Sequence, residues 1–117
     1  MAESLLRVKS KRFAVDIVKS CRIMRNNRVE YSLVDQLLRC GTSIGANIHE
    51  AQFAQGTKDF VSEFEIALKE CNECDYWLDL LKSTDSIDEA QCDSLLGECD
   101  EIRRMLISSV TTLKSKL

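Results

Sequence analysis

FVSEFEIALKECNECDYWLDLL, residues 60–81, carries the clearest structural pattern in the chain. Its apolar residues recur at alternating spacings of four and three, which places them on one face of a helix. These positions are Phe60, Phe64, Ala67, Cys71, Cys74, Leu78 and Leu81. Thr57 is suited to cap the start. The pattern predicts a long amphipathic helix that packs on its neighbours through a heptad-like seam.

Three further helices are predicted, two before this one in the sequence and one after it. The first runs from about Glu3 to Asn26, and the second from Ser32 to Ala54, with Asp35 completing a box-like cap and Gly56 fitting a left-handed stop. A capping box S-x-x-E at residues 86–89 opens the last helix. The seams of the first and last helices are Leu6, Phe13, Ile17, Cys21 and Met24, and Cys92, Leu95, Cys99, Ile102, Leu106 and Leu113.

The composition agrees with long helices joined by short turns. The 117 residues include no proline and only four glycines, and 44% are apolar, enough for one core. Connections of a few residues force neighbouring helices to run antiparallel. We therefore predict an all-α, up-and-down antiparallel four-helix bundle, with residues 1–117 forming a single domain.

The sequence also bears on location and thiol chemistry. Residues 1–13, MAESLLRVKSKRF, place charges where a signal peptide needs an apolar run, and no segment approaches the roughly 20 apolar residues that span a bilayer. We expect a cytoplasmic protein without membrane contact. The six cysteines are accordingly expected to be free thiols.

Catalytic and cofactor chemistry finds little support in this chain. His49 is the only histidine, which leaves few ways to build a metal or catalytic site, and no phosphate-binding glycine motif occurs. We expect no enzyme activity, no cofactor and no metal. Cys71 and Cys74 form a C-x-x-C that could meet Cys40 and Cys99 at one height of the bundle. Core packing is the ordinary interpretation, with a thiol metal or redox site as the alternative.

The charges are unevenly distributed although the net charge is only -3. Residues 1–29 contain eight basic and two acidic residues, whereas residues 84–101 contain seven acidic residues and no basic one. On a helical wheel the basic side chains fall on the exposed side of the first helix. They are Arg7, Lys11, Arg12, Lys19, Arg22 and Arg25. Three interpretations stay open: a solvated face, contact with nucleic acid, or pairing with an acidic neighbour. No aromatic residue interleaves with them, which argues against stacking on bases.

The second helix has two unusual features. Gly41 and Gly45 lie in its interior, where each costs about 1 kcal/mol relative to alanine, so we expect another helix to approach closely there, within the bundle or from a second subunit. Ser43, Asn47 and Glu50 form a polar stripe beside the core. Hydrogen bonds to a neighbouring helix are the simplest explanation for the stripe, and ligand binding is the alternative.

Residues 36–81, QLLRCGTSIGANIHEAQFAQGTKDFVSEFEIALKECNECDYWLDLL, resemble the four-helix-bundle family named for proteins encoded in intervening sequences of bacterial 23S rRNA genes. The shared features are the run S-I-x-x-N-I-x-E at residues 43–50, K-D-F at 58–60, I-A at 66–67, and an aromatic residue at Tyr76 or Trp77. Some members carry the label of a small-subunit ribosomal protein, S23. More distantly, the chain is similar to accessory proteins of diversity-generating retroelements.

The resemblance implies a non-enzymatic bacterial protein that assembles as a ring of five. It also implies that Ser43, Asn47 and Glu50, which match the family run, are structural or interface positions. We therefore expect a homopentameric scaffold that contacts RNA or a nucleic-acid enzyme through its basic first helix. The alternative is a protein-protein adaptor whose basic face meets the acidic side of a neighbour.

Overall fold

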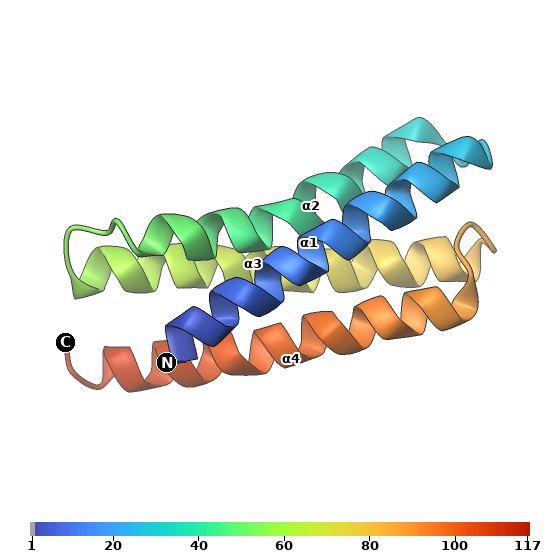
Figure 1. The fold of residues 1–117 in the computed structure, drawn as a ribbon. Helices are drawn as coiled ribbons and strands as arrows, with labels where there is room; N and C mark the ends of the chain where they lie inside the picture. Colours follow the sequence, from blue (N-terminus) through green and yellow to red (C-terminus); the bar gives the residue numbers. More distant parts are fainter. Residues whose placement is uncertain (1) are drawn as a thin grey trace.

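The backbone of residues 2–117 and the side chains from Leu5 onward are described by a computed structural model. These residues form four α-helices: α1 (Ala2–Asn26), α2 (Tyr31–Ala51), α3 (Thr57–Ser83) and α4 (Glu89–Lys114) (Figure 1). The turns between them are short, as the scarcity of breakers predicted. The expected all-α class is confirmed for the described residues.

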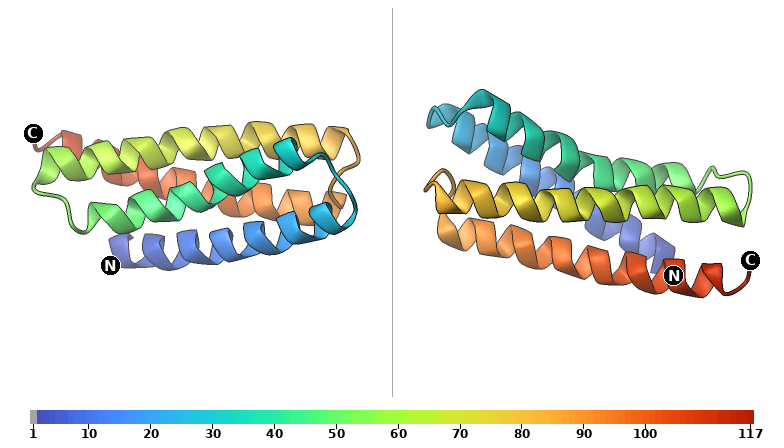
Figure 2. Two further views of the ribbon diagram at one scale, coloured as in Figure 1. Left: turned by 90° about the horizontal axis from the view of Figure 1, so that it is seen from above. Right: turned by 180° about the vertical axis from the view of Figure 1, so that it is seen from behind.

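The helices run alternately up and down, and each packs on the next (Figure 1). Packing of α1 on α4 closes the bundle, which measures 47 × 20 × 20 Å. Figures 1 and 2 show that α1 is inclined to α3 and α4, so that the α1–α2 connection lies apart from the α3–α4 connection at the same end. The predicted four-helix bundle is therefore confirmed, with one helix set at an angle.

The core is made by the predicted seams with two exceptions. Phe60 and Leu113 are only half-buried, and Val61 and Val110 are buried in their helices instead. Both exceptions fall near helix ends, at the start of α3 and the end of α4. At the end of a bundle no further layer of side chains covers the seam, so a large side chain there stays partly in water.

The predicted helix starts are wrong in detail. The residue before α2 is Glu30, which makes no side-chain cap, and α3 follows Gly56, whose φ of 164° is extended rather than left-handed. The start of α4 is capped by Asp88, whose carboxylate accepts from the Gln91 amide at 3.0 Å. Ser86 does not cap α4: its side-chain oxygen lies 2.7 Å from Thr84 Oγ1, and its amide donates to Leu81 O at 2.9 Å at the end of α3.

Two non-glycine residues take the left-handed conformation that ends helices. They are Arg28, with φ of 62°, after α1, and Asp85, with φ of 56°, after α3. The Arg28 amide donates to Arg25 O and the Val29 amide to Met24 O, both at 3.0 Å, which is the Schellman arrangement. The chain therefore reverses within four residues, and the first residue of α2 returns beside the last turn of α1.

Gly41 and Gly45 both face α1, as expected for a close approach within the bundle. A Cβ atom on Gly41 would lie 2.8 Å from Ile17 Cγ2, and one on Gly45 would lie 3.3 Å from the backbone oxygen of Ser10. Ile17 is fully buried and the Ser10 oxygen belongs to the backbone, so neither can easily move away. The two glycines therefore allow α1 and α2 to pack closely.

We expect Gly41→Leu to lower the free energy of unfolding by about 1–3 kcal/mol, because the new side chain overfills the contact with Ile17. Gly97 of α4 is the matched control, since a Cβ atom added there would meet no described atom within 4 Å. Gly97→Leu should raise stability by up to about 1 kcal/mol through helix propensity. Thermal unfolding of both variants measures the difference, and equal melting temperatures would contradict the packing argument.

Candidate functional site

The outward side of α1 carries positive charge without matching acids. Lys11, Arg12, Lys19 and Arg22 are exposed, and none has a carboxylate oxygen within 4 Å among the described side chains. An exposed cation without an ionic partner keeps its full attraction for an external anion. We call these four residues the free cations of α1.

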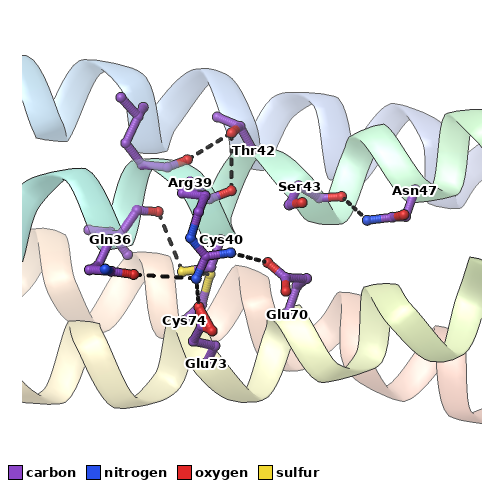
Figure 3. A network of polar contacts seen from close by, with 11 residues as sticks. Gln36, Arg39, Cys40, Thr42, Ser43, Asn47, Glu70, Glu73 and Cys74 are labelled. Carbon is purple, nitrogen blue, oxygen red and sulfur yellow. Dashed lines mark hydrogen bonds and ion pairs between the residues drawn. The ribbon is translucent and has the colours of Figure 1, made fainter.

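On the other helices, many basic side chains form ion pairs with acidic side chains. Figure 3 shows Arg39 of α2 between Glu70 and Glu73 of α3, with 3.3 Å between Arg39 Nη1 and Glu70 Oε2. Further cross-helix pairs join Lys82 to Asp93 at 2.8 Å, Lys114 to Glu65 at 2.6 Å, and Arg103 to Asp75. Many basic side chains beyond α1 are therefore already neutralised by neighbours.

The predicted basic face is divided by the packing of α1 between α2 and α4. Arg7 and Lys11 line a groove of about 600 Å³ between α1 and α2, together with Thr42, Gly45 and His49. The rim of this groove is basic and its floor contains small residues. It has the size and charge to receive an anionic group.

Arg12 and Lys19 instead lie on the α4 side of α1. Arg12 lines a cleft of about 320 Å³ with Asp16 and Glu98, where Lys9 pairs with Glu101 of α4. Burial raises the pKa of Glu98 to about 7, and repulsion from the Asp16 carboxylate adds to the effect while Arg12 opposes it. The Glu98 carboxylate at this seam therefore titrates near neutral pH.

Arg25 differs from the free cations because it is held at the end of α1. Its guanidinium carbon lies 4.6 Å from the centroid of the Tyr31 ring, and Nη2 lies 3.6 Å from Asp35 Oδ1. Tyr31, at the start of α2, is 68% exposed. No aromatic residue interleaves with the basic side chains along α1, but the tight turn after α1 brings Tyr31 of α2 against Arg25.

Apolar side chains also lie on the surface of α1. Val8 is 64% exposed, Ile23 61% and Leu5 50%, and Val15 is exposed to a lesser extent. Single exposed apolar residues are common, but these share one helix with the free cations. A mixed apolar and cationic surface is compatible with contact to another protein as well as to nucleic acid.

The polar stripe of α2 makes fewer contacts with other helices than predicted. Asn47 Nδ2 donates to the carbonyl oxygen of Ser43 in its own helix at 2.8 Å (Figure 3). Glu50 is exposed. The prediction that this stripe bonds to a neighbouring helix is therefore wrong for the Asn47 amide, because the carbonyl one turn earlier is within reach.

The six cysteines are free and buried. Cys40 and Cys74 point toward each other (Figure 3), and the distance between their Sγ atoms is 3.2 Å. Cys99 Sγ lies 3.6 Å from Cys71 O. The pKa values of Cys71 and Cys74 are raised, because hydrogen bonds to neighbouring thiols and burial both favour the protonated form. Within the described residues, no group of three or more His, Cys, Asp or Glu side chains is arranged to hold a metal ion. The geometry favours core packing of the thiols.

The fold and this surface define the class of protein as a four-helix bundle with segregated charge, in which no described helix is long and apolar enough to cross a membrane. Residues 4–108 match the family described as 23S rRNA-intervening sequence protein. The chain belongs to this family. A comparison with curated proteins gave no match.

A crystal structure from Bacteroides thetaiotaomicron has the same fold. It is described as a protein of unknown function from the S23 ribosomal protein family, and it is 43% identical in sequence with a TM-score of 0.91. The match covers 95% of this chain and 99% of the other. Neither the family description nor this structure points to an enzyme.

We expect the native thiols to be unreactive toward a water-soluble disulfide reagent. Burial keeps the reagent away, and the raised pKa of Cys21, about 11, leaves that thiol protonated at neutral pH. Absorbance with Ellman's reagent should show almost no reaction in buffer and all six thiols after unfolding in guanidinium chloride. Rapid labelling of the folded protein would contradict the assignment of these residues to the core.

The pH dependence of stability should report on Glu98. Its pKa is about 7 in the folded chain against an ordinary 4.5, so the folded state binds more protons between these values and stability falls as the pH rises through them. The contribution is fully present below about pH 4.5 and is lost above about pH 7. Melting temperatures measured across this range should therefore decline.

Glu98→Gln should flatten this decline and raise stability at alkaline pH, since the amide cannot ionise. Glu50→Gln is the control, because Glu50 is exposed and has no ionic partner among the described side chains. The same pH profile in wild type and Glu98→Gln would show that folding does not raise the pKa of Glu98.

Proposed function

We propose that this protein is a non-enzymatic cytoplasmic scaffold that assembles with copies of itself and contacts RNA through α1. The observation that supports it is the set of free cations, Lys11, Arg12, Lys19 and Arg22, on one helix of an otherwise acidic chain. Several exposed cations on one helix suit the phosphate backbone of a nucleic acid, which binds by charge without reading sequence.

The distribution of ion pairs strengthens this proposal. A bundle whose basic residues served only solubility would gain by placing them near its acidic residues, as Arg39 and Arg103 do. The free cations of α1 instead form no ion pair with a described acid, although Arg12 shares a cleft with Asp16 and Glu98. Their mutual repulsion costs some stability, which is offset when an anion binds.

Self-assembly is supported by apolar side chains that remain exposed on several helices. Besides those of α1, Ile66 of α3 and Ile107 of α4 are exposed by 43% and 49%. Side chains of this kind supply the apolar part of subunit interfaces. A ring of five copies is the stoichiometry that the family resemblance implies, and native mass spectrometry measures it.

A protein-protein adaptor is the second candidate, and the position of Val8 and Val15 favours it. Both lie on the outward side of α1 among the free cations. An acidic amphipathic surface, such as that of a neighbouring copy, would satisfy both the charges and the apolar groups. In that case α1 is occupied by protein and unavailable to phosphate.

RNA binding should be measurable as a salt-sensitive interaction. We expect the purified protein to bind fluorescently labelled structured RNA, including a 23S rRNA fragment, with micromolar or tighter affinity at about 50 mM salt. Four phosphate contacts imply a loss of affinity on the order of 100-fold between about 50 and 200 mM salt. Fluorescence anisotropy measures both quantities.

Charge reversal separates the two candidates. Lys11→Glu/Arg22→Glu should weaken RNA binding at least about tenfold and reduce the salt dependence while assembly stays intact. Lys58→Glu/Lys69→Glu is the control, because it reverses two exposed cations of α3 that have no ionic partner among the described residues. Loss of assembly in the α1 variant, or no RNA binding by wild type at low salt, would favour the adaptor.

A further inference from the structure

The last turns of α1 and the connection to α2 carry three arginines, and Tyr31 follows at the start of α2. Arg22 and Arg28 are exposed, Arg25 covers one face of the Tyr31 ring at 4.6 Å, and Tyr31 is 68% exposed. We call these four residues the arginine-tyrosine corner. A ring that is held on one side and open on the other can accept a second planar group.

Two features of this corner are unfavourable for the folded chain alone. Arg28 occupies a left-handed position with φ of 62°, where glycine is favoured on steric grounds. Arg25 Nε is buried without a hydrogen-bond partner among the described residues, and the Asp35 carboxylate that pairs with its guanidinium is 3.6 Å away. Buried donors in native proteins almost always have partners. The donors and charge available to an external acceptor are those of Arg22 and Arg28, which are exposed and have no ionic partner among the described side chains.

The chemistry of the corner selects among nucleic-acid structures. Phosphates of any strand can pair with Arg22 and Arg28, but only an unpaired base can leave its neighbours and stack on an exposed aromatic ring. An arginine fixed on the far side of the ring strengthens such a stack through its cation-π contact. Glu30 and Asp35 are the acids closest in sequence, and they are outnumbered by the three arginines.

We infer that the arginine-tyrosine corner binds an unpaired nucleotide of RNA, with the base stacked on the open face of Tyr31 and its phosphate held by Arg22 and Arg28. This inference rests on the proposed contact of α1 with RNA and narrows it to loops, bulges or single strands. Fully paired RNA engages the free cations and Arg28 through its phosphates, without stacking a base on Tyr31.

The test compares two labelled RNAs at about 50 mM salt: a hairpin with an unpaired loop and a blunt duplex of the same number of nucleotides. Wild type should bind the hairpin more tightly. Tyr31→Ala should weaken hairpin binding about tenfold and leave duplex binding within about twofold, since one stacked base is lost. Tyr31→Phe should restore hairpin binding, because the ring remains and only the hydroxyl is removed.

Two further variants separate recognition from folding. Tyr76→Ala removes a tyrosine of α3 that is 60% exposed, and should leave both affinities unchanged. Arg28→Gly relieves the left-handed backbone, so its melting temperature should equal or exceed that of wild type while both RNAs bind several-fold more weakly. This combination distinguishes loss of a contact from loss of structure.

The two possible negative results lead to different conclusions. Equal hairpin binding by wild type and Tyr31→Ala, with salt-sensitive binding of both RNAs, would overturn base stacking and leave the proposed RNA contact standing. Absence of binding to either RNA by wild type would overturn the proposed function and this inference with it.

Discussion

The close packing of α1 on α2 is the contact on which the functional surface depends. Gly41 meets the Ile17 side chain and Gly45 meets the backbone at Ser10, so the two helices approach more closely than larger residues would allow. This contact fixes the inclination of α1, places Arg7 and Lys11 at the edge of a groove with α2, and leaves the other side of α1 facing α4. The basic residues are thereby distributed over two seams rather than along one ridge.

Most ion pairs among the described residues of this bundle involve α2, α3 and α4, whereas α1 keeps several unpaired cations. The α2–α3 and α3–α4 contacts are crossed by ion pairs such as Arg39 with Glu70 and Lys82 with Asp93, each worth little alone because it is largely exposed. Their collective effect is to neutralise these helices locally. The first helix keeps unmatched positive charge, and its contact with α4 includes Glu98, whose pKa is raised to about 7. The least neutralised helix is therefore the natural place for an anionic partner.

The seams of the core could be predicted from sequence because burial follows helical period alone. Prediction failed where several local hydrogen bonds compete. Ser86 could cap α4, but its hydroxyl pairs with that of Thr84 and the Asp88 carboxylate caps the helix instead. Gly56 is extended at the start of α3 rather than left-handed at the end of α2, and the left-handed positions belong to Arg28 and Asp85. Which residue caps a helix, and which takes the left-handed conformation, depends on the donors and acceptors that remain unpaired once the turn has formed.

The sequence by itself determined the helical class, the antiparallel order, the buried faces and the segregation of positive charge on the first helix. Periodicity, short connections and composition are local properties, and they suffice for these conclusions. Only the tertiary structure decided which cations are neutralised and that Tyr31 stands over Arg25. Both facts depend on how side chains from different helices meet. Arg25 and Tyr31 are six positions apart on either side of a reversing turn, so no helical periodicity connects them and the sequence pattern could not predict their contact.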